Sequence, residues 1–149
     1  MIRLIDRWSC CEKWWSVPYC SELELAMKKL SVQIQSDLVT DIDAENIVEL
    51  LMPLAKDTSL VQESHVTSGS DDGRYINIDF QTSDAPRLWR AIQSTLCLTS
   101  EKKLPISSAI MVVCEGENSW NDYLLLHHFD ESKAIDIFPS PKLKPGKPN

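Results

Sequence analysis

The spacing of apolar residues predicts that the chain alternates between helices and strands. Ser21 and Glu24 form a capping box, in which two side chains bond the first turn of a helix reciprocally. We therefore expect a first helix that begins here. Its apolar stripe, at helical spacing, is Leu23, Ala26, Met27 and Leu30.

Residues 31–36 have a pattern that fits two structures. Val32 and Ile34 alternate with glutamine, which favours a short strand. Leu30, Ile34 and Leu38 also have the spacing of a helix that continues to residue 38. We expect the strand, and the fold prediction below fails if the helix forms instead.

A second and a third helix are each predicted from a capping residue and an apolar face. Asp41 or Asp43 can cap the second helix, and Pro53 should end or kink it, because proline removes a backbone donor. The apolar face of this helix is Ile47, Val48, Leu51, Leu54 and Ala55. Ser83 or Asp84 begins the third helix, with a proline tolerated in its first turn. Its buried face is Leu88, Ala91, Ile92, Thr95 and Leu96.

Strands are predicted where apolar residues alternate or run together. The polar stretch from Ser68 to Gly73 is a turn between strands at residues 60–66 and 75–81, which together predict a hairpin. Further strands are expected at residues 106–114 and 123–129, with a short additional one at 135–138.

The order of these elements predicts an α+β fold. After the first helix the order is β-α-β-β-α-β-β, which is that of a ferredoxin-like sandwich with an extra C-terminal strand. Residues 109–113 and 124–126 are apolar on both strand faces and need cover on both sides. We expect the Trp-rich N-terminal segment and its helix to cover the sheet. The five tryptophans, including Trp89 in the third helix, are then mainly structural, and an aromatic ligand box is the alternative.

Composition narrows the number of domains and the kind of partner. The 149 residues suit one domain, which we place at residues 1–138, followed by a disordered Pro/Lys-rich tail at 139–149. The net charge is −7, but three of the 15 basic residues lie in the tail, so residues 1–138 carry 12 basic and 22 acidic side chains. This acidic body repels nucleic acid and favours a basic protein as partner.

The cysteines and the apolar runs predict a soluble, cytoplasmic protein. The chain has an odd number of cysteines without metal-binding or redox-motif spacing: Cys10, Cys11, Cys20, Cys97 and Cys114. The N-terminus lacks the apolar core of a signal peptide, and the longest apolar run is far shorter than the roughly 20 residues of a transmembrane helix. We therefore expect reduced cysteines, no metal, no cofactor and no membrane association.

A histidine pair and one cysteine are the candidates for catalytic chemistry. Adjacent strand residues point to opposite faces, so His127 and His128 cannot jointly bind one metal ion. His128 and Asp130 share a face and can form an acid–base pair, and Cys114 can pair with a histidine of a neighbouring strand. The adjacent Glu115 opposes thiolate formation at Cys114. We expect both histidines to lie at a strand end, one packed and one solvated, and no catalytic residue.

Residues 115–136 are densely acidic, and Trp120 and Tyr123 lie among the acids. Interfaces favour aromatic anchors surrounded by charge, so we expect this stretch to bind a basic protein. The residues expected to contact that partner are Glu115, Glu117, Trp120, Asp122, Asp130 and Glu131. One alternative is a solvated acidic turn with Trp120 in the core. The other is a divalent-cation site, although EF-hand spacing is absent.

One segment resembles a known class of proteins. Cys114-Glu115-Gly116, followed by the run from Trp120 to Asp130, is similar to segments of small cytoplasmic immunity proteins of bacterial contact-dependent and type VI toxin systems. The resemblance implies a non-enzymatic protein that binds a cognate toxin and occludes its active site. Two other functions stay open: a general protein-interaction adaptor, and a small enzyme that uses His128 with Asp130, or Cys114.

Overall fold

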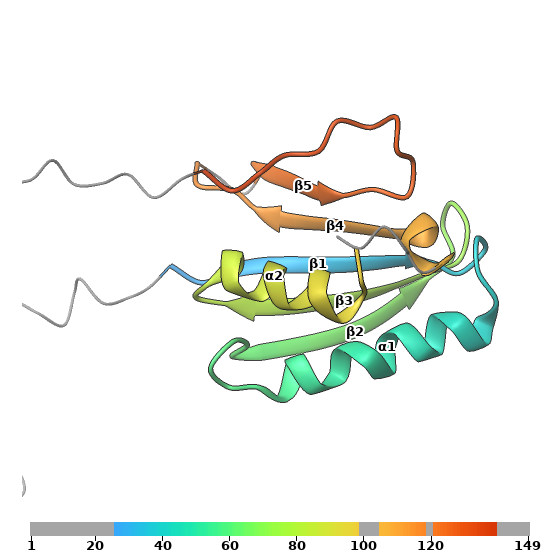
Figure 1. Ribbon diagram of the computed structural model, residues 1–149, viewed down its shortest axis with the longest axis horizontal. Coiled ribbons are helices and arrows are strands. Elements are labelled where there is room, and N and C mark those ends of the chain that lie inside the picture. Colours follow the sequence, from blue (N-terminus) through green and yellow to red (C-terminus); the bar gives the residue numbers. More distant parts are fainter. Residues whose placement is uncertain (1–25, 99–104, 119–120, 140–149) are drawn as a thin grey trace, which may run out of the picture.

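Five strands pair into one antiparallel sheet in the order β2-β3-β1-β4-β5. The computed structural model describes residues 26–98, 105–118 and 121–139 (Figure 1). The strands are β1 (Lys28–Gln35), β2 (Glu63–Gly69), β3 (Tyr75–Thr82), β4 (Ile110–Glu115) and β5 (Tyr123–His127). The helices are α1 (Asp41–Lys56), α2 (Ala85–Thr95) and the 3-10 helix η1 (Pro105–Ala109). The fold is α+β, as expected.

The core lies between one face of the sheet and the two long helices. Leu30, Val32 and Ile34 of β1 are fully buried, because every second residue of a strand points to the same face. They pair with buried or half-buried apolar residues of β3 and β4 on either side. The helices complete this core with Ala44, Ile47, Leu51, Leu88, Ile92 and Leu96.

The opposite face of the sheet is divided into a polar and an apolar part. On β1 and β3 it presents polar side chains, and the Ser31 hydroxyl donates a hydrogen bond to the Asp79 carboxylate across the strand pair. On β4 and β5 the same face presents Met111, Val113 and Leu125, all of them half-buried. The apolar part is therefore formed by β4 and β5, the two strands whose sequences are apolar on both faces.

The described part of the first predicted helix is a strand. Lys28 to Leu30 belong to β1, and Ser21 to Leu25 lie outside the described residues. The strand expected at residues 31–36 is confirmed through Gln35, and the alternative helix to residue 38 is wrong. Leu30 fits both a helical stripe and a strand alternation. Pairing with two neighbouring strands decides in favour of the strand.

The other two helices form where they are predicted, with different details at their ends. Thr40, instead of Asp41 or Asp43, caps α1, and its hydroxyl accepts the Asp43 N–H at 3.1 Å. α1 does not end at Pro53 but continues to Lys56, since Leu54 and Ala55 still pack against the core. In α2 the Asp84 carboxylate caps the first turn, as expected.

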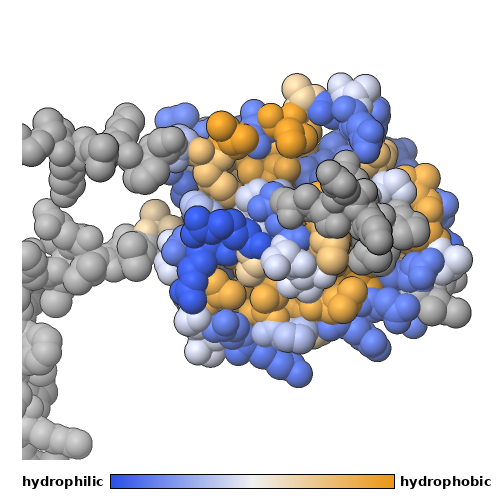
Figure 2. Space-filling view, in the orientation of Figure 1, coloured by the Kyte–Doolittle hydropathy of each residue, from blue (hydrophilic) through white to orange (hydrophobic). Residues whose placement is uncertain are grey.

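The predicted strands are all present except the last, with shifted ends. β2 begins three residues later than expected, and residues 105–109 form η1 before β4 begins. β5 ends at His127 instead of Phe129, and residues 135–138 form no strand. They nevertheless run back beside β5, where Asp136 bonds to Leu125 (Figure 1). Apolar side chains gather at this border of the molecule (Figure 2).

Two further expectations concern segments that are not described. The Trp-rich N-terminal segment and nearly all of the Pro/Lys-rich tail lie outside the described residues, whereas Trp89 is half-buried and packs against the core. None of the described helices combines the length and apolar character needed to cross a membrane.

Candidate functional site

The acidic residues expected to contact a partner fall into two groups at opposite ends of β5. Glu115, Glu117 and Asp122 lie at the turn between β4 and β5, and Asp130 and Glu131 follow the other end of β5. The length of β5 separates the groups by roughly 16 Å at about 3.3 Å per residue. Trp120 lies outside the described residues. The structure therefore places the described members of the predicted set in two groups, one at each end of β5.

Asp122 organises the β4–β5 turn. Its carboxylate accepts hydrogen bonds from the backbone N–H and the side-chain amide of Asn118, both at 3.1 Å. Its backbone carbonyl accepts the Gly116 N–H at 2.7 Å. A side chain at Gly116 would overlap the Asp122 carboxylate and would force it to move from its present position. The role that these contacts assign to Asp122 is structural.

Glu115 and Glu117 bond to the beginning of β1. The Glu115 carboxylate accepts the backbone N–H of Lys29 at 2.9 Å, and Glu117 forms a 2.7 Å ion pair with the Lys28 ammonium group. Both contacts join segments more than 80 residues apart in the chain. These two carboxylates therefore have internal cationic or backbone partners.

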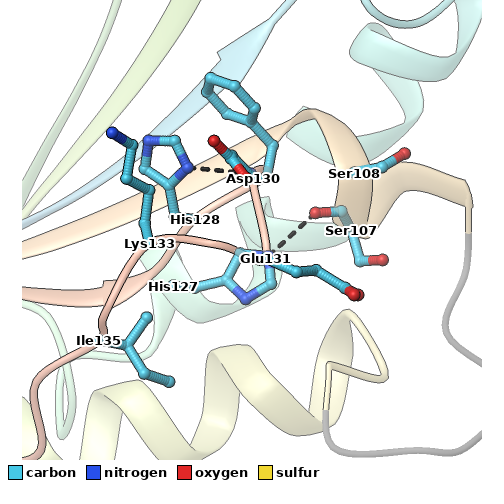
Figure 3. A pocket seen from close by; sticks show the side chains of 9 residues that line it. Ser107, Ser108, His127, His128, Asp130, Glu131, Lys133 and Ile135 are labelled. Atoms are coloured by element: carbon cyan, nitrogen blue, oxygen red, sulfur yellow. Dashed lines mark hydrogen bonds between the residues drawn. The ribbon is translucent and has the colours of Figure 1, made fainter.

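The second acidic group lies at a pocket of about 340 Å³ between η1 and the segment that follows β5 (Figure 3). We call it the β5-end pocket. Its lining residues are Ser107, Ser108, His127, His128, Phe129, Asp130, Glu131, Lys133 and Ile135. The pocket therefore combines carboxylates, imidazoles, hydroxyls, one ammonium group and apolar side chains.

Each of the two histidines forms a hydrogen bond with the backbone of a residue that lines this pocket. His127 Nε2 lies 2.9 Å from the Ser107 carbonyl oxygen, which can only accept, so Nε2 carries the proton and donates it. His128 Nδ1 lies 2.9 Å from the Asp130 backbone N, whose N–H donates, so Nδ1 is the unprotonated acceptor. The His128 ring also contacts the Phe129 ring, with 4.2 Å between centroids. Both imidazoles thus have structural partners.

The acid–base pair of His128 and Asp130 does not form. The Asp130 group that contacts His128 is the backbone N–H, while the Asp130 carboxylate accepts the Ser132 N–H at 2.9 Å. Hydrogen bonds from Ser132 are the main cause that lowers the pKa of Asp130, with smaller contributions from Lys133 and His128. Asp130 is exposed and therefore charged at neutral pH, which suits it to attract a cation.

Cys114 is placed against the core, away from both members of the histidine pair. It is fully buried and lies opposite Leu124 in the β4–β5 ladder, whereas His127 lies opposite Val112. Burial is the main cause that raises the pKa of the Cys114 thiol to about 11, and the Glu115 charge adds to it against the opposing Lys28. The thiol therefore stays protonated at neutral pH and is a poor nucleophile.

Sequence reasoning identified four residues of the β5-end pocket and missed its other wall. His127, His128, Asp130 and Glu131 are close in sequence, so their common location could be inferred. Ser107 and Ser108 lie some 20 residues earlier, and no local signal links them to the histidines. Within the described ranges, no three His, Cys, Asp or Glu side chains converge as a metal site would require.

Comparison with known proteins identifies no relative of this chain. The chain matches no protein-family model, no curated protein and no solved structure.

Proposed function

We propose that the chain is a non-enzymatic binding protein that docks a basic partner protein at the β5-end pocket. The observation that carries the proposal is the pair of exposed acidic residues, Asp130 and Glu131, at a pocket that also has apolar walls. A lysine or arginine side chain matches such a site, because its stem is apolar and its head is cationic. Lys133 also lines the pocket, but the two carboxylates outnumber it.

The positions of the candidate catalytic groups support binding over turnover. A nucleophile needs a base within hydrogen-bond reach, and Cys114 is instead buried opposite Leu124. The acid–base pair expected of His128 and Asp130 is also not formed, because His128 contacts the Asp130 backbone N–H while the Asp130 carboxylate bonds to Ser132.

We further propose that the partner is a bacterial toxin whose active site the protein occludes in the cytoplasm. The support for this specific form is the resemblance of residues 114–130 to immunity proteins, together with the net charge of −7. Acidic inhibitors reach basic partners quickly, because complementary fields steer the encounter. A general adaptor would share the charge but would bind a partner without toxic activity.

The finer description of the fold is also a proposal. The element order and the strand order β2-β3-β1-β4 support a ferredoxin-like sandwich that β5 extends. Met111, Val113 and Leu125 lie on the face opposite the two helices. This apolar surface supports the placement of residues 1–25 as its cover.

The docking proposal is tested with the full chain as bait in lysate of its source cells. The captured protein is identified and purified, and its affinity is measured for the wild type and for the double variant Asp130→Asn/Glu131→Gln. Asp71→Asn/Asp72→Asn is the matched control, because both residues are exposed and the same two charges are lost from a different loop. We expect the pocket variant to bind about tenfold more weakly and the control to change affinity by less than about twofold.

Two outcomes would contradict docking at the pocket. Equal weakening by both double variants would show a response to net charge alone, and capture of only acidic or neutral proteins would exclude a basic partner.

The proposal that the partner is a toxin has its own test. Expression of the captured protein alone should arrest growth, and co-expression of the wild-type chain should restore it. A partner that does not arrest growth would contradict the toxin proposal and would favour the adaptor function.

A further inference from the structure

β2 is an exposed border of the described sheet. It pairs with β3 along its whole length, from Glu63 opposite Gln81 to Gly69 opposite Tyr75, and with no other described strand. In an edge strand, alternate N–H and C=O groups point outward and can pair with another chain. At the other border, residues after β5 bond to Leu125. Of the two borders in the described part, β2 is therefore the one open to an additional strand.

β2 carries one charged side chain, Glu63 at its end, but it lacks most of the features that protect an edge strand. Natural edges are commonly protected by lysine, proline, a β-bulge or very short length. β2 has seven residues, with the sequence ESHVTSG, and it pairs with β3 in unbroken register. Val66, at the middle of β2, is 49% exposed. An exposed apolar side chain on an open edge favours docking of a partner strand.

A groove of about 400 Å³ lies between α1 and β2. Its apolar lining comes from Val48 of α1, Val66 of β2 and Ile76 of β3. α1 runs along the β2 border of the sheet (Figure 1). A strand added to β2 would therefore have the helix on one side, and its side chains that point to the helix would enter the groove.

The charges at the groove specify the kind of segment that fits. Glu45 and Glu49 of α1 line it, and both are exposed, whereas its lining includes no lysine or arginine. Glu63 at the start of β2 is a further exposed carboxylate, which lies on the opposite face of the sheet and is bonded to His65 at 2.9 Å. Pairing of β2 with β2 of a second copy would bring these like charges together, which is unfavourable.

We propose that β2 and this groove bind an extended segment of a partner protein whose groove-facing side chains, at every second residue, include both apolar and basic residues. The segment adds to the sheet beside β2 through backbone hydrogen bonds. Its apolar side chains cover Val66 and Val48, and its lysine or arginine side chains pair with Glu45 and Glu49. This surface is separate from the β5-end pocket and does not depend on the function proposed for it.

The test uses the full chain, isotopically labelled for NMR, and two synthetic peptides. In one peptide the residues that share a face are alternately valine and lysine, with threonine between them, and the other peptide has the same sequence with glutamate in place of each lysine. At low ionic strength the lysine peptide should shift the amide signals of residues 63–69 and of Glu45, Val48 and Glu49 saturably. It should also slow hydrogen exchange at alternate amides of β2. We expect the glutamate peptide to bind at least about tenfold more weakly.

A matched pair of variants separates the groove from the rest of α1 and β2. Val66→Arg places a cation in the groove and should weaken binding of the lysine peptide about tenfold. Leu50→Arg is the control, because Leu50 of α1 is 43% exposed and does not line the groove. It should leave the affinity unchanged, and the NMR spectra of both variants confirm that each is folded.

Four results would overturn the proposal. The first is the absence of saturable shifts at β2, and the second is equal binding of the two peptides. The third is equal weakening by Val66→Arg and Leu50→Arg. The fourth is a concentration-dependent dimer, seen by sedimentation and broken by Val66→Arg, which would make a second copy the occupant.

Discussion

Asp136 bonds to both backbone groups of Leu125. Its N–H donates to the Leu125 carbonyl at 2.7 Å, and its carboxylate accepts the Leu125 N–H at 2.8 Å. Asp136 thus makes the two bonds that one residue of an antiparallel neighbouring strand would make, with its side-chain carboxylate in place of the backbone carbonyl. Two residues later, Phe138 packs against the core. The segment after β5 is held at this edge without forming a strand.

Removing the Asp136 carboxylate should loosen this edge. We expect Asp136→Ala to lower the free energy of unfolding by about 1 kcal/mol and to speed hydrogen exchange at the Leu125 amide, because its acceptor is lost. Asp136→Asn keeps an acceptor and should preserve most of the protection. Ile137→Ala is the control, since Ile137 is 81% exposed. Unchanged exchange at Leu125 in Asp136→Ala would show that the carboxylate does not hold the segment.

A side chain at Gly116 should destabilise the β4–β5 turn. The added Cβ of Gly116→Ala would overlap the Asp122 carboxylate and displace it from Asn118. We expect a loss of about 1–2 kcal/mol in the free energy of unfolding, measured by urea denaturation. In an Asp122→Ala background the same change should cost clearly less, because the overlap is gone. Strict additivity of the two changes would exclude the steric explanation.

The Cys114 thiol should reduce stability at alkaline pH. Burial raises the pKa of Cys114 from 9.0 to about 11. Between these values the unfolded chain releases a proton that the folded chain keeps, so the free energy of unfolding falls as pH rises. The expected loss at pH 10 is about 1 kcal/mol. Cys114→Ala should lower stability at every pH through its cavity but lack this alkaline component. Urea denaturation at pH 8 and at pH 10 measures the change in the free energy of unfolding between these pH values for each protein. An equal change in the wild type and in Cys114→Ala would contradict the prediction.

Alkylation provides an independent check on Cys114. Cys97 is exposed, whereas Cys114 is fully buried, so iodoacetamide should modify Cys97 much faster in the native protein at neutral pH. Peptide mapping by mass spectrometry distinguishes the two sites. Rapid native modification of Cys114 would reopen its use as a nucleophile.

A charge at Val113 tests whether the apolar part of the open sheet face is covered. If residues 1–25 lie over it, Val113→Asp buries a carboxylate and should cost more than about 2 kcal/mol. Gln33→Glu, on the polar part of the same face, is the control and should cost less than about 0.5 kcal/mol. Chemical denaturation of the full chain measures both. A small cost at Val113 would place the N-terminal segment elsewhere.

Elements with local signals were predictable from the sequence. β3 has clean alternation, and α2 has Asp84, Pro86 and an apolar stripe, so each carries its own evidence within about ten residues. The prediction of the first helix was wrong over its described part, because Leu30 fits both a helical and a strand pattern. Only its pairing with Phe80 and Cys114, which are distant in sequence, decides between them.

The candidate site shows the same division between local and distant contacts. The common location of His128 and Asp130 follows from their spacing. The bond from His127 to Ser107, and that from Lys29 to Glu115, depend on which strands become neighbours. The continuous acidic stretch was interpreted as one surface. Because β5 is extended, it carries the two ends of that stretch apart.

The unequal borders of the sheet limit how the molecule can associate. A sheet with two open edges can stack copies without end, which is the geometry of a fibre. Here Asp136 occupies backbone groups at one border, and β2 is open at the other. A copy that pairs through β2 therefore has no second open border in the described sheet, so association of copies through this sheet would stop at two chains.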